Sequence, residues 1–359
     1  MKKILFFLTV ILTFATAQSQ TKRALFLGNS YTYVNNLPQM IANAALSTGD
    51  ILSYDSHAPG GYYLGQHATD SVSLNKIKIG NWDYVVLQDQ SMSYAYPPPY
   101  FYQMPSAHKL DSIIRVYNNC VQTLLYTTWG RKNGDSYFCP APACPADTVI
   151  TRTYYQMDSA IQINYMFVAD SLRAMASPVG AVWRYIRRNH PTIELFQPDD
   201  SHPSEAGTYA AACCFYTTIF RKDPTLISFN STLSAADAAD IRHAAKVTVY
   251  DNLLYWNIGK YDSIVNAACI TSIQNRFIHS VFKIYPNPTN RSATLEFNND
   301  TKQSCTLELY NSRGQMVRTV NSIVTDKIEI QTQELSNGLY LFRLLNNKQI
   351  FATGKLAIE

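Results

Sequence analysis

The sequence of 359 residues is poor in charge and has no strong bias toward either sign. Charged residues make up 16% of the chain and hydrophobic residues 47%, a balance that excludes a disordered protein. The formal net charge is +4, and residues 4–280 contain 19 basic and 19 acidic side chains. Because binders of polyanions need a concentrated basic surface, we expect no nucleic acid among the partners.

Metal-binding patterns and long apolar runs are also missing. The seven cysteines form no pair of Cys-x-x-Cys motifs, and no His/Cys cluster has the spacing of a zinc site. We therefore expect no metal and no cofactor. Beyond the first 17 residues, no apolar run reaches the ~20 residues that a membrane-spanning helix needs. We accordingly expect no transmembrane segment in the mature chain.

The first 17 residues have the order of a secretory signal peptide. Two lysines precede an apolar stretch at residues 4–14, and the small residues Ala15, Thr16 and Ala17 follow it. We predict cleavage after Ala17 and export of the remaining chain.

Export permits disulfide bonds between the cysteines. Cys139 and Cys144 bracket a short Pro-rich loop that a disulfide could close. An odd number of cysteines leaves at least one thiol unpaired within the chain.

The length favours two structural units, and the texture of the sequence changes near residue 275. Residues 20–275 alternate short apolar runs with helical patterns, which predicts a parallel sheet covered by helices on both faces. The strands are expected at residues 23–27, 51–57, 83–87 and 121–127. Helices are expected at residues 106–117, 154–176, 181–188, 203–220 and 234–256. Residues 281–359 instead show strand-like segments separated by turns, which predicts a small all-β unit.

Ser30 lies where the first predicted strand turns into a helix. A hydroxyl there stands at the rim of the sheet, beside backbone N–H groups that can hold an oxyanion. A serine needs a base to attack at neutral pH, and His202 is the best candidate. Asp199 lies three residues earlier and can orient the imidazole. We expect His202 to end a loop, because Pro203 is favoured as a first helical residue.

Each of these residues also has a simpler explanation. Ser30 alone is typical of a helix N-cap, and an Asp-x-x-His segment alone is compatible with a solvated loop. The joint order along the chain favours catalysis: a serine at a strand end, then a glycine, an amide and Asp-x-x-His. In this order the sequence resembles the SGNH hydrolases, also called GDSL-type esterases. The match covers residues 24 to about 220 in short blocks.

The resemblance implies a flavodoxin-like three-layer α/β/α sandwich with a parallel sheet, and ester hydrolysis. Ser30 is the implied nucleophile, His202 the base and Asp199 its partner. The N–H groups of Ser30 and Gly61, with the Gln90 side-chain amide, are the implied oxyanion donors.

Two blocks depart from the family pattern. The usual Gly-Asp-Ser is Gly-Asn-Ser here, with Asn29 at the centre, which removes a charge beside the nucleophile. The usual Gly-x-Asn-Asp is replaced by residues 88–91, so Gln90 stands for the asparagine with a side chain one methylene longer. Gln88 is the alternative amide donor.

Aromatic residues surround these blocks. They can stack on sugar rings, or they can form a packed cover over a loop-rich face. The rings near the blocks are Tyr31, Tyr33, Tyr62, Tyr63, Tyr94, Tyr96, Tyr100, Phe101 and Tyr102. Trp129 and Arg131 follow the fourth predicted strand. From the whole set we predict substrate contacts for Tyr31, Tyr62, Trp129 and Arg131.

Residues 281–359 resemble the carboxy-terminal sorting domain of type IX secretion, a system of the Bacteroidetes. The matching segments are residues 285–288, 309–314 and 335–340, with a lysine-containing end. The resemblance implies a β-sandwich, the type IX machinery as partner, and release or attachment at the outer surface.

The sequence thus leads to a secreted serine esterase that removes short acyl groups, acetyl foremost, from a carbohydrate. A lipid or thioester hydrolase is the alternative among enzymes. A non-catalytic surface protein that binds glycans is the alternative outside them.

Overall fold

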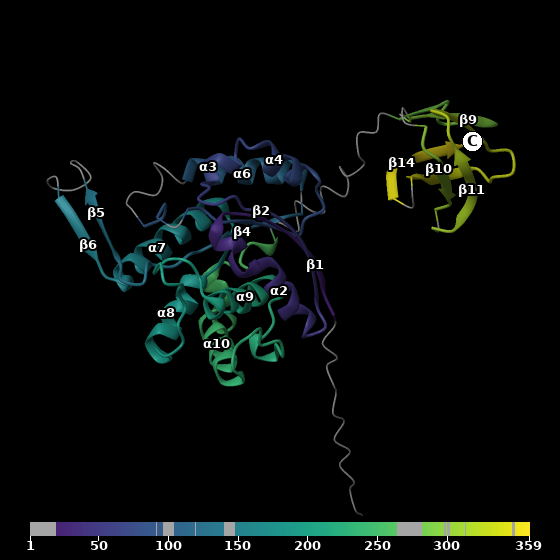
Figure 1. The fold of residues 1–359 in the computed structure, drawn as a ribbon. Helices are drawn as coiled ribbons and strands as arrows, with labels where there is room; N and C mark the ends of the chain where they lie inside the picture. The colour runs from purple at the N-terminus through teal and green to yellow at the C-terminus, as the bar shows by residue number, and fades with distance from the viewer. Residues whose placement is uncertain are drawn as a thin grey trace, which may run out of the picture. The chain divides into compact units, whose positions relative to one another are not determined.

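The structure is a computed structural model that describes residues 19–90, 92–95, 104–118, 120–139, 148–263, 282–297, 299, 302–312, 314–346 and 349–359. The predicted signal peptide lies outside these residues. The chain divides into two units, one ending at Asn266 and the other beginning at Ala267 (Figure 1).

The first unit is built on a parallel sheet with the strand order β2-β1-β3-β4-β7. Its strands are β1 (Thr21–Leu27), β2 (Ile51–His57), β3 (Tyr84–Leu87), β4 (Gln122–Tyr126) and β7 (Met175–Ser177). Leu27 at the end of β1 lies opposite His57 of β2 and Leu87 of β3, so the three carboxyl ends are level. This is the flavodoxin-like order, and it confirms the predicted α/β class.

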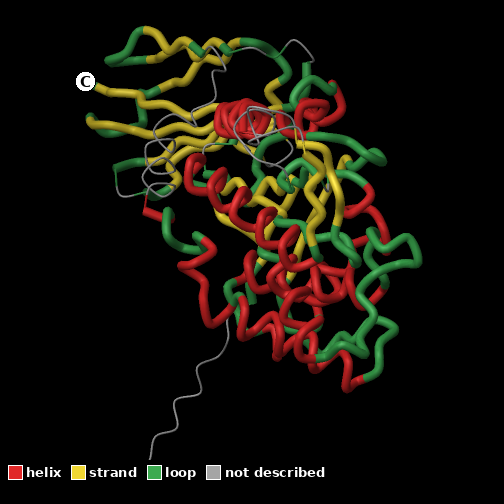
Figure 2. Tube along the Cα trace, turned by 90° about the vertical axis from the view of Figure 1, so that its left-hand side faces the viewer, coloured by secondary structure: helices red, strands yellow, loops and turns green. Residues whose placement is uncertain are grey.

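Helices cover both faces of the sheet (Figure 2). The helical elements are α1 (Ser30–Tyr33), η1 (Val34–Asn36), α2 (Leu37–Leu46), α3 (Leu64–His67), α4 (Ser71–Lys78), α6 (Met104–Tyr117), α7 (Tyr154–Leu172), α8 (Val179–Asn189), α9 (Glu205–Phe220), η2 (Pro224–Leu226), α10 (Ala235–Thr248) and η3 (Tyr250–Trp256).

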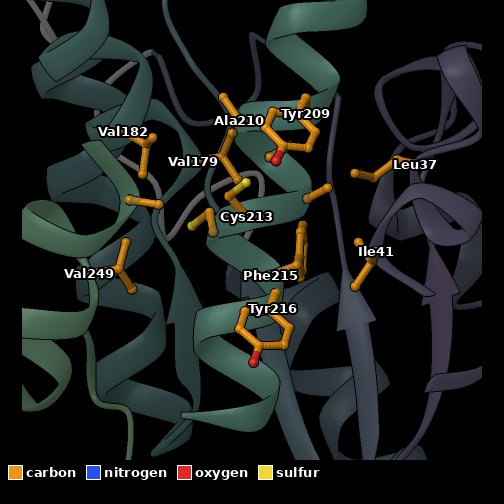
Figure 3. Close-up of a cluster of buried hydrophobic side chains, with 14 of the residues drawn as sticks. Leu37, Ile41, Val179, Val182, Tyr209, Ala210, Cys213, Phe215, Tyr216 and Val249 are labelled. Atoms are coloured by element: carbon orange, nitrogen blue, oxygen red, sulfur yellow. The ribbon is translucent and has the colours of Figure 1, made fainter. Parts of the chain in front are cut away.

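Two separate apolar cores lie on the two faces of the sheet, because successive side chains of a strand point to opposite sides. Ala24 and Phe26 of β1 join the core made with α2, α8, α9 and α10. Leu25 and Leu27 join the core made with α4, α6 and α7. Figure 3 shows part of the first core, where the labelled rings of α9 lie between side chains of α8 and side chains of α2. Nearly every side chain of α9 is buried.

Several elements differ from the sequence prediction. The helix expected at residues 154–176 ends at Leu172, and Met175–Ser177 instead forms the edge strand β7. Helix α9 begins at Glu205 with Ser204 as its N-cap, so Pro203 is not its first residue. The antiparallel hairpin of β5 (Asp135–Cys139) and β6 (Thr148–Arg152) was not predicted.

The second unit contains two antiparallel sheets that share one apolar core. One sheet has the order β11-β10-β13-β14 and the other β12-β9-β8. The strands are β8 (Lys283–Tyr285), β9 (Ser292–Glu296), β10 (Cys305–Tyr310), β11 (Met316–Ile323), β12 (Lys327–Gln331), β13 (Gly338–Asn346) and β14 (Gln349–Ile358). The all-β class predicted for this unit is confirmed.

Cys120 and Cys139 each take part in a disulfide bond, whereas Cys213, Cys214 and Cys305 are free and buried. Cys144, the predicted partner of Cys139, lies outside the described residues. Among the helices that the structure describes, none is long and apolar enough to span a membrane.

Candidate active site

The turn that carries Ser30 has no room for a larger residue at Gly28. A Cβ placed on Gly28 would lie 2.3 Å from Thr32 Oγ1 and 2.6 Å from Gln88 Oε1, well inside van der Waals contact. The next residue, Asn29, is the N-cap of α1 and accepts a hydrogen bond from the Tyr31 N–H. The sharp strand-to-helix turn therefore places Ser30 at the first position of α1, at the carboxyl edge of the sheet.

A buried pair of amide side chains holds this turn against β3. Gln88 Oε1 accepts from the Asn29 backbone N–H (2.8 Å) and from the Thr32 hydroxyl (3.0 Å). Gln88 Nε2 donates to Asn29 Oδ1 (2.9 Å), and Asn29 Nδ2 donates to the Tyr62 carbonyl (2.9 Å). Asn29 therefore uses both ends of its amide, which an aspartate cannot do because a carboxylate has no N–H.

His67 also holds this turn, through the backbone carbonyl of Gly28. Its ring is buried and lies 2.8 Å from both the Gly28 carbonyl and Ser73 Oγ. Since a carbonyl only accepts, Nε2 carries a proton. Nδ1 faces the Ser73 hydroxyl, which also donates to Asp70 Oδ2 (3.0 Å). Burial lowers the pKa of His67, which favours the neutral form of the ring.

Ser30, His202 and Asp199 form a continuous hydrogen-bonded chain. The distance from Ser30 Oγ to His202 Nε2 is 2.8 Å, and His202 Nδ1 contacts the Asp199 carboxylate. Because a carboxylate only accepts, Nδ1 carries the proton and Nε2 is left to accept from the Ser30 hydroxyl. The structure thus brings together two segments that are 172 residues apart in the chain.

The loop around Asp199 stabilises its ionised form. Asp199 Oδ1 accepts from the backbone N–H groups of His202 (2.9 Å) and Ser201 (3.1 Å). Partial burial opposes ionisation, but the hydrogen bonds from the His202 ring and from these two N–H groups outweigh it. The pKa of Asp199 is therefore lowered.

Tyr31 and Trp129 are buried next to the loop that carries His202. Both rings are buried and stack on each other at 4.6 Å. The Tyr31 hydroxyl is 2.7 Å from Ser201 Oγ, and Trp129 Nε1 donates to the Ser201 carbonyl (3.0 Å). The burial of both rings argues against the substrate contacts predicted for them, and those contacts stay a prediction. The two rings support the loop that carries His202.

The other two predicted substrate contacts are only partly buried. Tyr62 packs its ring edge to face against His57 and His67. Arg131 directs its Nε to Met92 Sδ at 3.4 Å. Tyr33 and Tyr63 are exposed, and Tyr94 is buried against Tyr165. The remaining predicted rings, Tyr96, Tyr100, Phe101 and Tyr102, lie outside the described residues.

The two candidate amides of the oxyanion hole differ in their surroundings. Gln88 is completely buried, and its NH2 group is engaged by Asn29 Oδ1 and the Asp89 carbonyl. Gln90 is partly exposed, and its Oε1 accepts from the Met92 N–H (2.6 Å), which assigns the carbonyl end of this amide to the loop. Gly61 is exposed with φ at +72°, a conformation that favours glycine.

Asp89 joins the two loops that carry Gly61 and Gln90, and sequence reasoning missed it. Its Oδ1 accepts from the backbone N–H groups of Gln90 (2.8 Å) and Leu64 (3.1 Å). Burial raises the pKa of this carboxyl to about 6. The only signal in the sequence for a role of Asp89 was its position next to Gln90, a predicted oxyanion donor.

Within the residues that the structure describes, no group of three or more His, Cys, Asp or Glu side chains could hold a metal ion. The groups available for chemistry are the serine hydroxyl, the imidazole, the carboxylate and the surrounding amides.

Residues 283–359 match the family model of the secretion system C-terminal sorting domain. The match confirms the sorting domain, and it implies a secreted or outer-surface location. The search of curated proteins finds no match to the chain.

The chain is also similar to several solved structures, which include SGNH hydrolases and esterases. One is a DUF4886 family protein from Bacteroides uniformis ATCC 8492, at 15% identity and TM-score 0.52, covering 66% of this chain and 95% of that one. A candidate SGNH hydrolase from Slackia heliotrinireducens has 24% identity and TM-score 0.44, covering 55% and 99%. A carbohydrate esterase family 3 protein from Talaromyces cellulolyticus has 11% identity and TM-score 0.37, covering 56% and 97%.

Proposed function

We propose that the first unit is a serine esterase that hydrolyses short-chain acyl esters, acetyl foremost. The observation that carries the proposal is the contact of 2.8 Å between Ser30 Oγ and His202 Nε2, with Asp199 on the other ring nitrogen. A nucleophile, a base and an orienting acid in this order define acyl transfer chemistry on many folds.

The roles follow from the proton positions. His202 Nε2 takes the proton of the Ser30 hydroxyl as the oxygen attacks the ester carbonyl, and Asp199 stabilises the imidazolium that forms. His202 then returns this proton to the departing alcohol, leaving an acylated Ser30. His202 next takes a proton from a water molecule as the water oxygen attacks this acyl ester. It returns the proton to the Ser30 oxygen as the carboxylic acid leaves, which restores the serine. The N–H groups of Ser30 and Gly61 with the Gln90 amide hold the oxyanion.

The proposed alcohol portion is a carbohydrate. Tyr33 and Tyr63 are exposed next to the nucleophile loop and the glycine loop, and such rings stack on sugars while their hydroxyls form hydrogen bonds. The sorting domain places the protein where extracellular glycans occur. We further propose that residues 1–17 are a signal peptide and that the type IX machinery recognises residues 283–359.

The test compares the exported chain with its Ser30→Ala variant on p-nitrophenyl acetate. We expect turnover by the first and almost none by the second. A fluorophosphonate probe, followed by mass spectrometry, should modify Ser30. Equal activity of the two proteins, or modification elsewhere, would overturn the esterase. Acetate release from acetylated glycans, compared with release of long-chain acids from lipids, then decides the acyl acceptor class.

A further inference from the structure

Arg131 lies in the loop after β4, beside the segment that carries His202. Trp129 Nε1 donates to the Ser201 carbonyl (3.0 Å), and the Lys132 N–H donates to the Asp200 carbonyl (3.0 Å). Residues 129–132 therefore run alongside residues 200–201, immediately before the catalytic imidazole.

The Arg131 side chain reaches the opposite loop of the site. Its Nε is 3.4 Å from Met92 Sδ, and the Met92 N–H donates to Gln90 Oε1. The Arg131 side chain thus connects the loop beside residues 200–201 with the segment that contains Gln90 and Met92.

Among the described residues, no carboxylate neutralises the charge of Arg131. Sulfur is a weak acceptor, and in the described part of the chain no carboxylate contacts this guanidinium. Two acids near this loop pair with Lys132 instead: Lys132 Nζ lies 2.7 Å from Glu194 Oε2 and 3.8 Å from Asp200 Oδ1. Asn133 also donates to Asp200 (2.8 Å).

A second arginine, Arg187 of α8, contacts the same loop and has a structural role. Arg187 stacks on Tyr154 at 4.0 Å and donates to the Lys132 carbonyl (3.1 Å), so its charge is covered by a ring and used to hold the loop. Arg131 has no such ring in the described residues, and it is partly exposed.

We propose that Arg131 binds a carboxylate of the substrate, so that the preferred esters are anionic. The inference rests on the proposed esterase function. The planar guanidinium presents paired N–H donors that match a carboxylate, which a neutral acyl ester does not offer. The carboxylate can belong to the alcohol, as in an acidic sugar, or to the acyl group, as in a dicarboxylic half-ester.

The test measures specificity rather than activity alone. The kcat/KM is determined on p-nitrophenyl acetate, on mono-p-nitrophenyl succinate, and on acetylated oligogalacturonides with free or methyl-esterified carboxyl groups. Each substrate is tried with the wild type, Arg131→Gln and Lys132→Gln. Lys132→Gln is the matched control, because it removes the adjacent cation that Glu194 already neutralises.

We expect the wild type to have a higher kcat/KM on one of the two anionic substrates than on its neutral counterpart: on the succinate than on the acetate, or on the free than on the methyl-esterified oligogalacturonide. In Arg131→Gln this preference should fall about 10- to 100-fold, as expected for a charge-assisted hydrogen bond. Lys132→Gln should keep it. A fall on the oligogalacturonide places the carboxylate on the alcohol, and a fall on the succinate places it on the acyl group. A preference that is absent, or equal in wild type and Arg131→Gln, would overturn the inference.

A binding measurement separates this inference from the esterase itself. Calorimetry with unesterified oligogalacturonide and with succinate compares Ser30→Ala with Ser30→Ala/Arg131→Gln, so that no turnover is needed. If the wild type hydrolyses none of the esters, the esterase proposal fails. Weaker binding of either ligand to the double variant than to Ser30→Ala would then still support the carboxylate site. If each ligand binds the two variants equally well, the carboxylate site is refuted.

Discussion

Asn29 and Gln88 are joined by two hydrogen bonds just beyond the carboxyl ends of the paired strands β1 and β3. The Asn29 N–H donates to Gln88 Oε1 at 2.8 Å, and Gln88 Nε2 donates to Asn29 Oδ1 at 2.9 Å. Both side chains are buried. The unusual asparagine of the nucleophile block and the unusual glutamine after β3 are therefore parts of one structure, which fixes the position of Ser30.

Replacement of Gln88 by methionine tests this pair. Methionine keeps the length of the side chain but removes the acceptor of the Asn29 N–H and the Thr32 hydroxyl. A buried polar group left without a partner costs about 1–3 kcal/mol, so the free energy of unfolding should fall by at least this amount. We also expect kcat to fall more than KM changes, because the turn that positions Ser30 loosens.

Urea unfolding and steady-state kinetics on p-nitrophenyl acetate measure the two effects. Gln39→Met is the control, since Gln39 is exposed on α2 and makes its hydrogen bonds at the surface. Unchanged stability in Gln88→Met would mean that the amide pair contributes nothing to the turn.

The sequence was sufficient to predict that Ser30, Asp199 and His202 come together, because each stands in a short local motif, and the three side chains are in contact in the structure. It could not reveal the role of Gln88, since a buried pair of amides 59 residues apart leaves no local signal. The burial of Trp129 was equally hidden. The sequence around a tryptophan that follows a strand does not indicate whether its ring faces solvent or packs on another ring.

The strand β7 was missed for a related reason. Met175–Ser177 has only three residues, and it follows a long helix whose apolar pattern continues into it. Its identity as a strand depends on pairing with β4, a tertiary contact.

Gln90 is expected to act on the rate rather than on folding. Gln90→Ala removes one oxyanion donor, which typically lowers kcat about 10²- to 10³-fold, whereas Ser30→Ala should abolish turnover. The thermal midpoint of Gln90→Ala should stay close to that of the wild type. Kinetics on p-nitrophenyl acetate and a thermal melt check both statements. A rate equal to the wild type would remove Gln90 from the oxyanion hole.

Asp89 should make stability depend on pH. Its pKa is raised to about 6 by burial, compared with about 3.9 in an unfolded chain. The native state therefore binds this proton more tightly than the unfolded state. The contribution of Asp89 to the free energy of unfolding should fall as the pH rises from about 4 to 6, by up to about 3 kcal/mol in total.

Asp89→Asn separates the charge from the hydrogen bonds. Asparagine keeps the Oδ1 acceptor for the N–H groups of Leu64 and Gln90 but has no proton to lose. We expect the variant to be at least as stable as the wild type at pH 8, with a flatter dependence between pH 4 and 6. Asp89→Ala, which also lacks the acceptor, should be less stable at both ends. Parallel pH profiles of wild type and Asp89→Asn would contradict the assignment.

Gly28→Ala should destabilise the first unit and displace the turn that carries Ser30. The added Cβ would meet Thr32 Oγ1 at 2.3 Å and Gln88 Oε1 at 2.6 Å, so the nucleophile turn and the amide pair must both shift. Overpacking of this kind typically costs 1–3 kcal/mol. Gly60→Ala is the matched control, because its Cβ would have only an ordinary contact with the Tyr33 hydroxyl at 3.7 Å. Chemical unfolding and esterase kinetics of the two variants should therefore diverge, with Gly28→Ala losing both stability and turnover. Similar losses in the two variants would show that the space around Gly28 does not control the position of Ser30.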